Sequence, residues 1–362
     1  MEIREWRAMA FRCIGLLGIV LLCSAFFGFL KGKESENVQA QRPEQKETAS
    51  DAYRMEARFS KQTYIENSSD TYIRIDKKEL SAKNVYLEDD YMHQTVSLIL
   101  EGAGKDAVET PVYRMKSDWH SRLDSVVRKV IRKVSKQEES DRYILDFKLQ
   151  TICEPVLYET EQSYYITLAD PREKYDKIVV IDAGHGGFDQ GTYSPDTKYT
   201  ESEYALKVVI WLKELLEQSD IKAYYTRLSD QDVSKADRVR LANTLKADAF
   251  VSVHCNASDP GETSAHGIEA LYSGRRQTAN RNLTSRELAS HLLQQVCRTT
   301  GRKKRGTIRR DGLYLMHHAK VPVSIIEIGY MTNPSELKYI LKDENQQTIA
   351  QGIYQGILDA LE

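Results

Sequence analysis

Strand-like and helix-like segments alternate from residue 177 to the carboxyl end, and this alternation limits the folds that the chain can adopt. The strand-like runs are rich in β-branched and aromatic residues, and stretches with apolar side chains at helical spacing separate them. The strand-like runs are KIVVI, AYYT, DAFVSV, GIEALY and VSIIE, and helices are expected near 201–218, 235–245, 285–298 and at the end of the chain. Such alternation predicts an α/β domain with a mostly parallel sheet and helices on both faces. In such sheets, functional sites lie beyond the carboxyl ends of the strands.

The amino terminus carries an apolar segment with the composition of a membrane helix. Residues 13–30 are uncharged, and Arg4, Arg7 and Arg12 precede them. The segment has about the minimum length for a transmembrane helix and no small-residue cleavage site follows it, so we favour an uncleaved anchor over a cleaved signal peptide. The basic residues before the segment predict a cytoplasmic stub, with the rest of the chain on the other side of the membrane.

Two further regions separate this anchor from the α/β domain at 177–362. Residues 31–58 carry many charges and few large apolar side chains, as in a polar linker. Residues 59–171 contain stretches such as TYIRI and RYILDF, which predict a small β-rich domain. Within it, apolar residues at helical spacing predict a helical insert at 117–136.

Overall composition excludes some classes of protein. The 362 residues are 41% hydrophobic, enough for about two domains with buried cores. A net charge of -2 gives no indication of nucleic-acid binding. The five cysteines form no C-x-x-C pair, so neither a disulfide framework nor a cysteine zinc cage is expected.

Two histidines follow strand-like runs in the α/β domain. His185 lies in the glycine-rich turn DAGHGG after KIVVI, and His254 follows DAFVSV. A phosphate-binding loop is the alternative for the glycine-rich turn, but Thr192 stands where that motif requires lysine. Imidazole is the commonest protein ligand of zinc, and two histidines plus one carboxylate leave a fourth position for water. The two histidines therefore predict a metal site at one edge of the sheet.

Two glutamates complete this candidate site. Thr200 and Glu203 have the spacing of a capping box, which leaves Glu201 at the helix start as the candidate third metal ligand. The alternative is that Glu201 only complements the helix dipole. Glu327 ends the apolar run VSIIE, where a carboxylate is costly unless it is paired or faces a site. A structural salt bridge is possible there, but a general base beside a water at the metal explains the position better.

The order of these motifs resembles the zinc-dependent N-acetylmuramoyl-L-alanine amidases of the amidase-3 type. The matching motifs between about 177 and 361 are IDAGHGG, ESEYAL, YTRLSD, DRVRLAN, ADAFVSVHCNA, GIEALY and SIIEIGYMTN. The resemblance implies Zn²⁺ ligands at His185, Glu201 and His254 and a catalytic glutamate at Glu327. It further implies hydrolysis of the amide bond between N-acetylmuramic acid and L-alanine in peptidoglycan, for cell-wall remodelling.

The resemblance also sets the expected surroundings. The protein would be a single-pass protein of the bacterial cell membrane with an extracytoplasmic catalytic domain. The β-rich region is similar to the AMIN-type modules that bind the cell envelope. Peptidoglycan, the membrane and an envelope activator protein are the candidate partners, and nucleic acid is not. A catalytically degenerate wall-binding scaffold and a metallopeptidase that cleaves another cell-wall amide are the alternatives.

Three further features of the α/β domain have less certain roles. Cys255 follows His254, and we expect its thiol to point away from the metal. Arg227 and Arg238 are expected to form structural ion pairs, with Asp230 able to pair with either. The basic run at 302–310 predicts a solvated loop, and binding of anionic wall polymers or of peptide carboxylates is the alternative.

Overall fold

The computed structural model of the chain describes residues 53–66, 71–77, 84–102, 113–115, 123–134, 139–276 and 282–362. The predicted membrane segment at 13–30 lies outside these residues, as does most of the predicted linker. No helix in the described part of the chain combines the length and the apolar character needed to cross a membrane.

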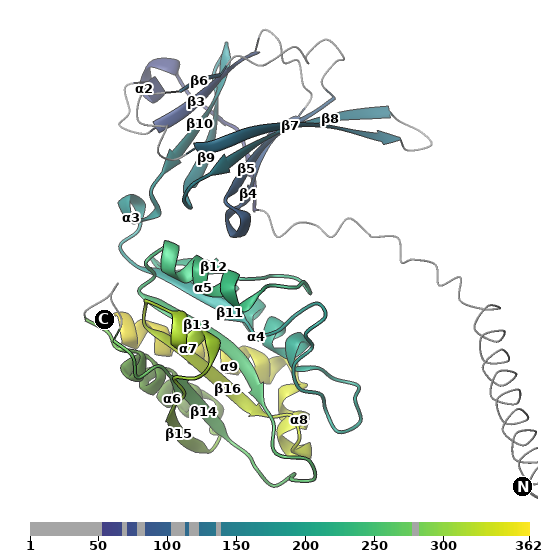
Figure 1. The fold of residues 1–362 in the computed structure, drawn as a ribbon, viewed down its shortest axis with the longest axis vertical. Coiled ribbons are helices and arrows are strands. Elements are labelled where there is room, and N and C mark those ends of the chain that lie inside the picture. The colour runs from purple at the N-terminus through teal and green to yellow at the C-terminus, as the bar shows by residue number, and fades with distance from the viewer. Residues whose placement is uncertain are drawn as a thin grey trace, which may run out of the picture. The chain divides into compact units, whose positions relative to one another are not determined.

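Residues 53–169 form two five-stranded sheets (Figure 1). In spatial order, the first consists of β1 (Tyr53–Glu56), β4 (Asn84–Asp90), β5 (Thr95–Glu101), β8 (Glu139–Leu149) and β7 (Leu123–Val134). The second consists of β2 (Arg58–Phe59), β9 (Glu154–Glu159), β10 (Ser163–Ala169), β3 (Thr71–Asp76) and β6 (Tyr113–Met115), and the short helices are α2 (Gln62–Glu66) and η2 (Tyr91–His93). Leu98, Phe147 and Ile166, from both sheets, are buried in one shared core. The first strand begins at residue 53, inside the range that the sequence assigns to the linker.

The helix predicted at 117–136 is wrong where the structure describes this range. Residues 123–134 form β7, which pairs in antiparallel register with β8 along its length. The apolar residues of this segment come in adjacent pairs, such as Val126 and Val127, which imitates helical spacing. Their β-branched side chains nevertheless favour a strand, and β8 supplies a partner of nearly equal length.

Residues 178–330 contribute the strands of a six-stranded sheet. The strands are β11 (Ile178–Ala183), β12 (Lys222–Tyr225), β13 (Ala249–Asn256), β14 (Ile268–Tyr272), β15 (Lys304–Arg309) and β16 (Val323–Tyr330), in the spatial order β12-β11-β13-β16-β14-β15. Neighbouring strands are parallel except for β14, which is antiparallel to β16. The predicted mostly parallel sheet is therefore confirmed.

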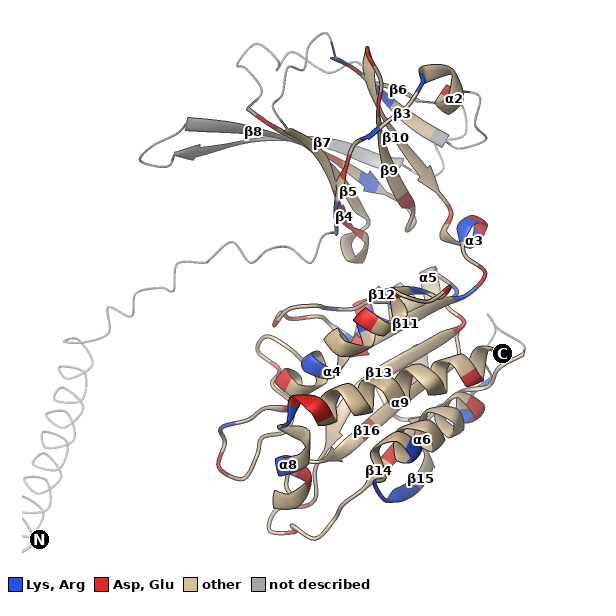
Figure 2. Ribbon diagram, turned by 180° about the vertical axis from the view of Figure 1, so that it is seen from behind, with Lys and Arg blue, Asp and Glu red and all other residues tan. Residues whose placement is uncertain are grey.

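Helices cover both faces of this sheet (Figures 1 and 2). They are α4 (Glu201–Leu216), α5 (Lys235–Thr244), α6 (Ser285–Thr300), α7 (Tyr314–His318), α8 (Pro334–Ile340) and α9 (Asp343–Leu361), and α3 (Pro171–Lys174) precedes β11. Helices α4, α6 and α9 share a core with Ile326 of β16, whereas α5 and α7 share a core with Ile325. Because successive side chains of a strand point to opposite faces, these two contacts place the helices on opposite sides of β16.

The basic run at 302–310 is not the predicted loop, because most of it forms strand β15 at the edge of the sheet. It pairs in parallel with β14. Charged side chains on an edge strand discourage pairing with a second chain, so this composition suits the position.

Candidate metal centre

A strained turn after β11 carries His185. This residue has a φ of 61°, in the left-handed region that non-glycine residues seldom adopt outside functional sites. Gly184, which precedes it, allows a close approach to the neighbouring strand, since a Cβ there would lie 2.4 Å from Cε1 of His254. The turn therefore presents the His185 ring to the end of β13.

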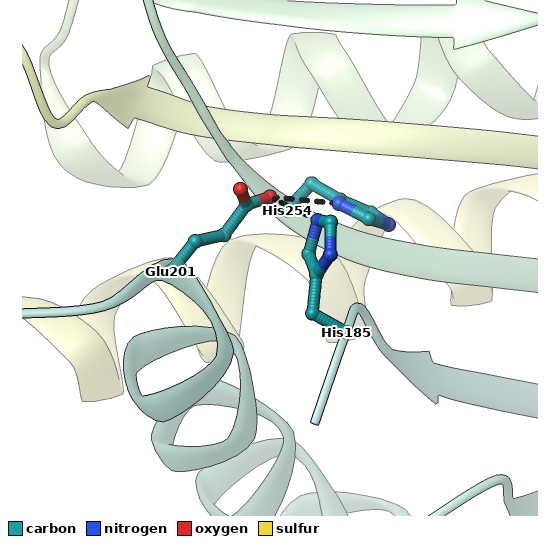
Figure 3. Close-up of side chains that lie close together, drawn as sticks. All are labelled: His185, Glu201 and His254. Atoms are coloured by element: carbon teal, nitrogen blue, oxygen red, sulfur yellow. Dashed lines mark hydrogen bonds and ion pairs between the residues drawn. The ribbon is translucent and has the colours of Figure 1, made fainter. Parts of the chain in front are cut away.

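Three side chains from separate segments converge at this edge of the sheet (Figure 3). His185 comes from the turn after β11, Glu201 from the start of α4 and His254 from β13. Oε1 of Glu201 lies 2.8 Å from Nδ1 of His254 and 3.2 Å from Nε2 of His185. The structure thus brings together the three residues that the sequence predicts as metal ligands.

The ionisation of Glu201 suits it to a cation. Its side chain is almost fully buried, and Oε2 accepts a hydrogen bond of 2.9 Å from the backbone nitrogen of Thr192. Burial alone would raise the pKa of Glu201, but the contacts with His185 and His254 outweigh burial and hold the pKa well below its ordinary value. The side chain is therefore an anionic carboxylate at neutral pH.

The donor set fits a zinc ion. One ligand atom from each of the three side chains lies within 4.8 Å of the others. Zinc bonds of about 2.1 Å in a tetrahedral site put ligand atoms roughly 3.4 Å apart, close to the separations from Glu201 to the two histidines. Two imidazoles and one carboxylate also form the ligand class of catalytic zinc sites that keep one position open.

The capping box predicted at the start of α4 is wrong. Thr200 is the N-cap residue, but its side chain accepts no hydrogen bond from the helix backbone. Its hydroxyl instead lies 3.2 Å from that of Ser202, and Glu203 forms an ion pair with Lys207. Glu201 still faces the two histidines, although the reasoning that separated it from Glu203 does not hold.

Glu327 lies beside the three converging residues. It is opposite His254 in the parallel pairing of β13 with β16. Burial, opposed by His254 and aided by Glu201 and Glu269, raises the pKa of Glu327 to about 7. Within the described residues, its buried Oε2 has no hydrogen-bond partner, and the predicted alternative of a salt bridge is not observed. A carboxyl group with these properties can accept and release a proton near pH 7.

Arg227 and Arg238, for which the sequence analysis expects structural ion pairs, hold the His185 turn in place. Arg227 donates a hydrogen bond of 2.7 Å to the carbonyl oxygen of Gly184, and Arg238 donates one of 2.6 Å to that of His185. Arg238 also forms a buried ion pair with Asp182. The structural ion pair expected for Arg238 is confirmed with Asp182 as its partner, and the carboxylate of Asp230 accepts a hydrogen bond from the backbone nitrogen of Gly187.

Asp182 and Asp189 are two site residues that the sequence analysis missed. Oδ1 of Asp189 lies 2.8 Å from Nδ1 of His185, whereas Glu201 approaches the other ring nitrogen, Nε2. Asp182 ends an apolar strand just as Glu327 does, and that shared signal could have identified it. By contrast, Cys255 lies in the core under α4, which confirms that its thiol points away from the site.

A pocket of about 660 Å³ opens beside these residues. Its lining includes His185, His254 and Glu327, together with apolar side chains such as Leu271 and Ile325. This volume and mixed lining are typical of sites that bind small molecules or peptide segments.

The part of the chain that holds these residues matches a known protein family. Residues 179–359 match the family model described as N-acetylmuramoyl-L-alanine amidase. The germination-specific N-acetylmuramoyl-L-alanine amidase of Bacillus subtilis is 31% identical over 196 residues, which cover 50% of this chain and 78% of that protein. The probable cell wall amidase LytH of Staphylococcus aureus is 31% identical over 183 residues, and the match spans 50% of this chain and 57% of LytH.

Among solved structures, an N-acetylmuramoyl-L-alanine amidase from Clostridium difficile 630 is 33% identical, with a TM-score of 0.47 and coverage of 51% of this chain and 96% of that one. The family match at 179–359 includes the converging histidines and glutamates. The chain therefore belongs to the N-acetylmuramoyl-L-alanine amidase family, the hydrolases that cleave the amide bond between N-acetylmuramic acid and L-alanine in peptidoglycan.

Proposed function

We propose that the chain cleaves peptidoglycan with Zn²⁺ held by His185, Glu201 and His254, and that Glu327 is the general base. The observation that carries this proposal is the convergence of the three donor side chains beside a buried carboxyl group without a partner. The anionic state of Glu201 supports the metal site, and the pKa of about 7 supports the role of Glu327.

The residues divide the hydrolysis between them. When bound, zinc would polarise the amide carbonyl and lower the pKa of water to about 7. Glu327 takes a proton from the attacking water as the new carbon–oxygen bond forms at the lactyl carbonyl. It then gives that proton to the alanine nitrogen as the carbon–nitrogen bond breaks. The products are a muramic acid carboxylate and a peptide with a free amino-terminal alanine.

Features in the rest of the chain support a location of this activity in the cell envelope. The apolar segment at 13–30 and the arginines before it support a single-pass anchor in the bacterial cell membrane, with an extracytoplasmic catalytic domain. We assign the β-rich region to envelope binding as an AMIN-like module, and an envelope activator protein is a candidate partner. Protease added to intact cells should remove the catalytic domain if this topology holds, and a protected domain would contradict it.

A digestion of purified peptidoglycan tests the activity itself. The fragment that starts at residue 51 is incubated with wall material in the presence of zinc, of a chelator, and of chelator followed by excess zinc. Mass spectrometry should detect peptides with a free amino-terminal alanine and intact glycan strands, only when zinc is available. Release of other fragments would indicate a different amide, and a zinc-loaded fragment that releases nothing would favour the degenerate scaffold or a missing activator.

A further inference from the structure

Three of the six basic residues in the run at 302–310 are neutralised by acidic neighbours. Three of its arginines form ion pairs with acidic residues. These pairs are Arg302 with Glu336, Arg305 with Glu269, and Arg309 with Asp311. Arg310 differs, because no acidic side chain among the described residues pairs with its guanidinium. Figure 2 shows this run as blue segments on and beside β15.

Arg310 lines the same pocket as Glu327. The lining also includes the apolar side chains of Leu271 and Ile325, which we call the apolar floor. Tyr314 belongs to the same lining and is 40% exposed, a high value for a large side chain. The pocket therefore combines a reactive region, an apolar floor and an unpaired cation.

Strand register gives the separation of Arg310 from the reactive region. Arg309 is opposite Tyr272 of β14, and Tyr272 is opposite Ser324 of β16. Arg310 is therefore four residues from the level of Glu327 and two strands away from β16, which together put their Cα atoms about 16 Å apart. The arginine and glutamate side chains reach across part of this distance, and about three residues of an extended peptide cover about 10 Å of it.

The lining of the pocket contains equal numbers of acidic and basic side chains, namely Asp182, Asp189, Glu269 and Glu327 against Lys235, Arg238, Arg305 and Arg310. Among the acidic residues in the lining, Asp182 is paired with Arg238, Glu269 with Arg305, and Asp189 with His185. Lys235, at the start of α5, is a second cation of the pocket and has no acidic partner within ion-pair distance in the described structure. Lys235 also acts electrostatically on Asp189, so Arg310 is the cation of the described lining that an entering anion meets without a competing carboxylate.

We propose that Arg310, assisted by Lys235, binds a free carboxylate of the stem peptide two to three residues beyond the scissile amide. This inference rests on the proposed function, because the amidase reaction puts a peptide in the pocket. A guanidinium forms paired hydrogen bonds with a carboxylate, which fixes both position and orientation. The apolar floor suits the small alanine side chain that follows the amide. Arg310 is thus a specificity residue for an anionic peptide.

The test compares Arg310→Gln with the wild-type chain on soluble muramoyl tripeptides. Four substrates are compared. One has free carboxylates, one has an amide on residue two, one has an amide on residue three, and one has amides on both residues. On the substrate with free carboxylates, the variant should show a KM raised about tenfold with little change in kcat, since a hydrogen-bonded charge pair is lost. On the substrate with both amides, wild type and variant should have the same KM. The single amide that abolishes the difference identifies which carboxylate is bound.

Two matched variants control for charge and folding. Arg309→Gln removes the neighbouring arginine, which is already paired with Asp311, and Lys304→Gln removes one positive charge from the same strand. Both should keep the wild-type KM on all four substrates. Unchanged zinc content and circular dichroism would show that Arg310→Gln is folded.

The outcomes separate the two proposals. If wild type cleaves the tripeptides and Arg310→Gln has the same KM on the substrate with free carboxylates, the subsite is wrong and the amidase assignment stands. An equal KM increase for the Arg309→Gln or Lys304→Gln variant would also overturn the subsite, because a general charge effect would explain it. If zinc-loaded wild type cleaves none of the substrates, the proposed function fails and the subsite fails with it.

Discussion

Replacement of Glu327 by glutamine should remove activity and, in the metal-free protein, raise stability at alkaline pH. Glutamine has nearly the same shape but cannot act as a base, so turnover should fall by a factor of about 10² to 10⁴. The stability change follows from the pKa of Glu327, which burial and the neighbouring glutamates raise from 4.5 to about 7 in the folded protein.

The sign and size of the stability change can be derived from that pKa. Below pH 4.5, the group is protonated in both the folded and the unfolded chain and contributes nothing. Between 4.5 and 7 the unfolded chain releases the proton and the folded chain keeps it, so the native state loses stability as pH rises, and the full penalty applies above 7. A rise from 4.5 to about 7 corresponds to roughly 2–3 kcal/mol, with some reduction because the pocket admits solvent.

Calorimetry in the presence of a chelator measures this effect. The transition of the catalytic half should occur about 5–10 °C higher for Glu327→Gln than for wild type at pH 8, and the difference should shrink toward pH 4.5. Glu203→Gln is the control, since Glu203 lies exposed on α4 and pairs with Lys207. A Tm difference that is the same at every pH, or a Glu327→Gln variant that cleaves peptidoglycan at the wild-type rate, would refute the reasoning.

Further perturbations test the metal centre and the turn that supports it. Glu201→Gln should weaken zinc binding at least about 100-fold in isothermal titration, and unchanged affinity would remove Glu201 from the ligand set. The kcat/KM profile should rise with pH around a midpoint at or below about 7, because Glu327 must ionise to act as a base and a bound cation lowers the pKa of Glu327 further. A midpoint above pH 8 would contradict the assignment of Glu327 as the base. Gly191→Ala should lower the zinc content of the protein, because a Cβ at this positive-φ position would lie 2.6 Å from Oε2 of Glu201. Full zinc occupancy in the purified variant would show that the added methyl group does not displace Glu201. Arg238→Met should lower the free energy of unfolding by about 3–5 kcal/mol, because it leaves Asp182 buried without its cation. A decrease in that free energy of less than about 1 kcal/mol in thermal unfolding would show that the ion pair is unimportant for stability.

The architecture of the catalytic half could be predicted from the sequence because its central strands are continuous apolar runs. Every residue of β11 is buried, and such runs are typical of a sheet covered on both faces. β7 and β15 could not be predicted in the same way. The apolar residues of β7 imitate a helix, and only its pairing with β8 decides the structure. β15 is so polar that a loop and an edge strand give the same composition.

Only some residues of the candidate site could be predicted from the sequence. His185 and His254 could be found because parallel strands bring their carboxyl ends to one edge. The ion-pair and hydrogen-bond partners of charged side chains could not be predicted, because they depend on the directions in which the side chains point. Arg238 pairs with Asp182 rather than with the nearer acidic residue in the sequence, since that choice depends on how the helix α5 packs. Glu203 likewise turns toward Lys207 on its own helix instead of back to the helix start.

The two arginines under the His185 turn have a consequence for how the enzyme responds to metal supply. The carbonyl oxygens of Ala183, Gly184 and His185 all accept hydrogen bonds from Arg227 or Arg238, so groups other than the metal ligands determine the backbone path of the turn. Loss of the ion should then leave the turn in place. A molecule in zinc-poor surroundings would keep its shape and regain activity at the speed of ion capture, without having to refold.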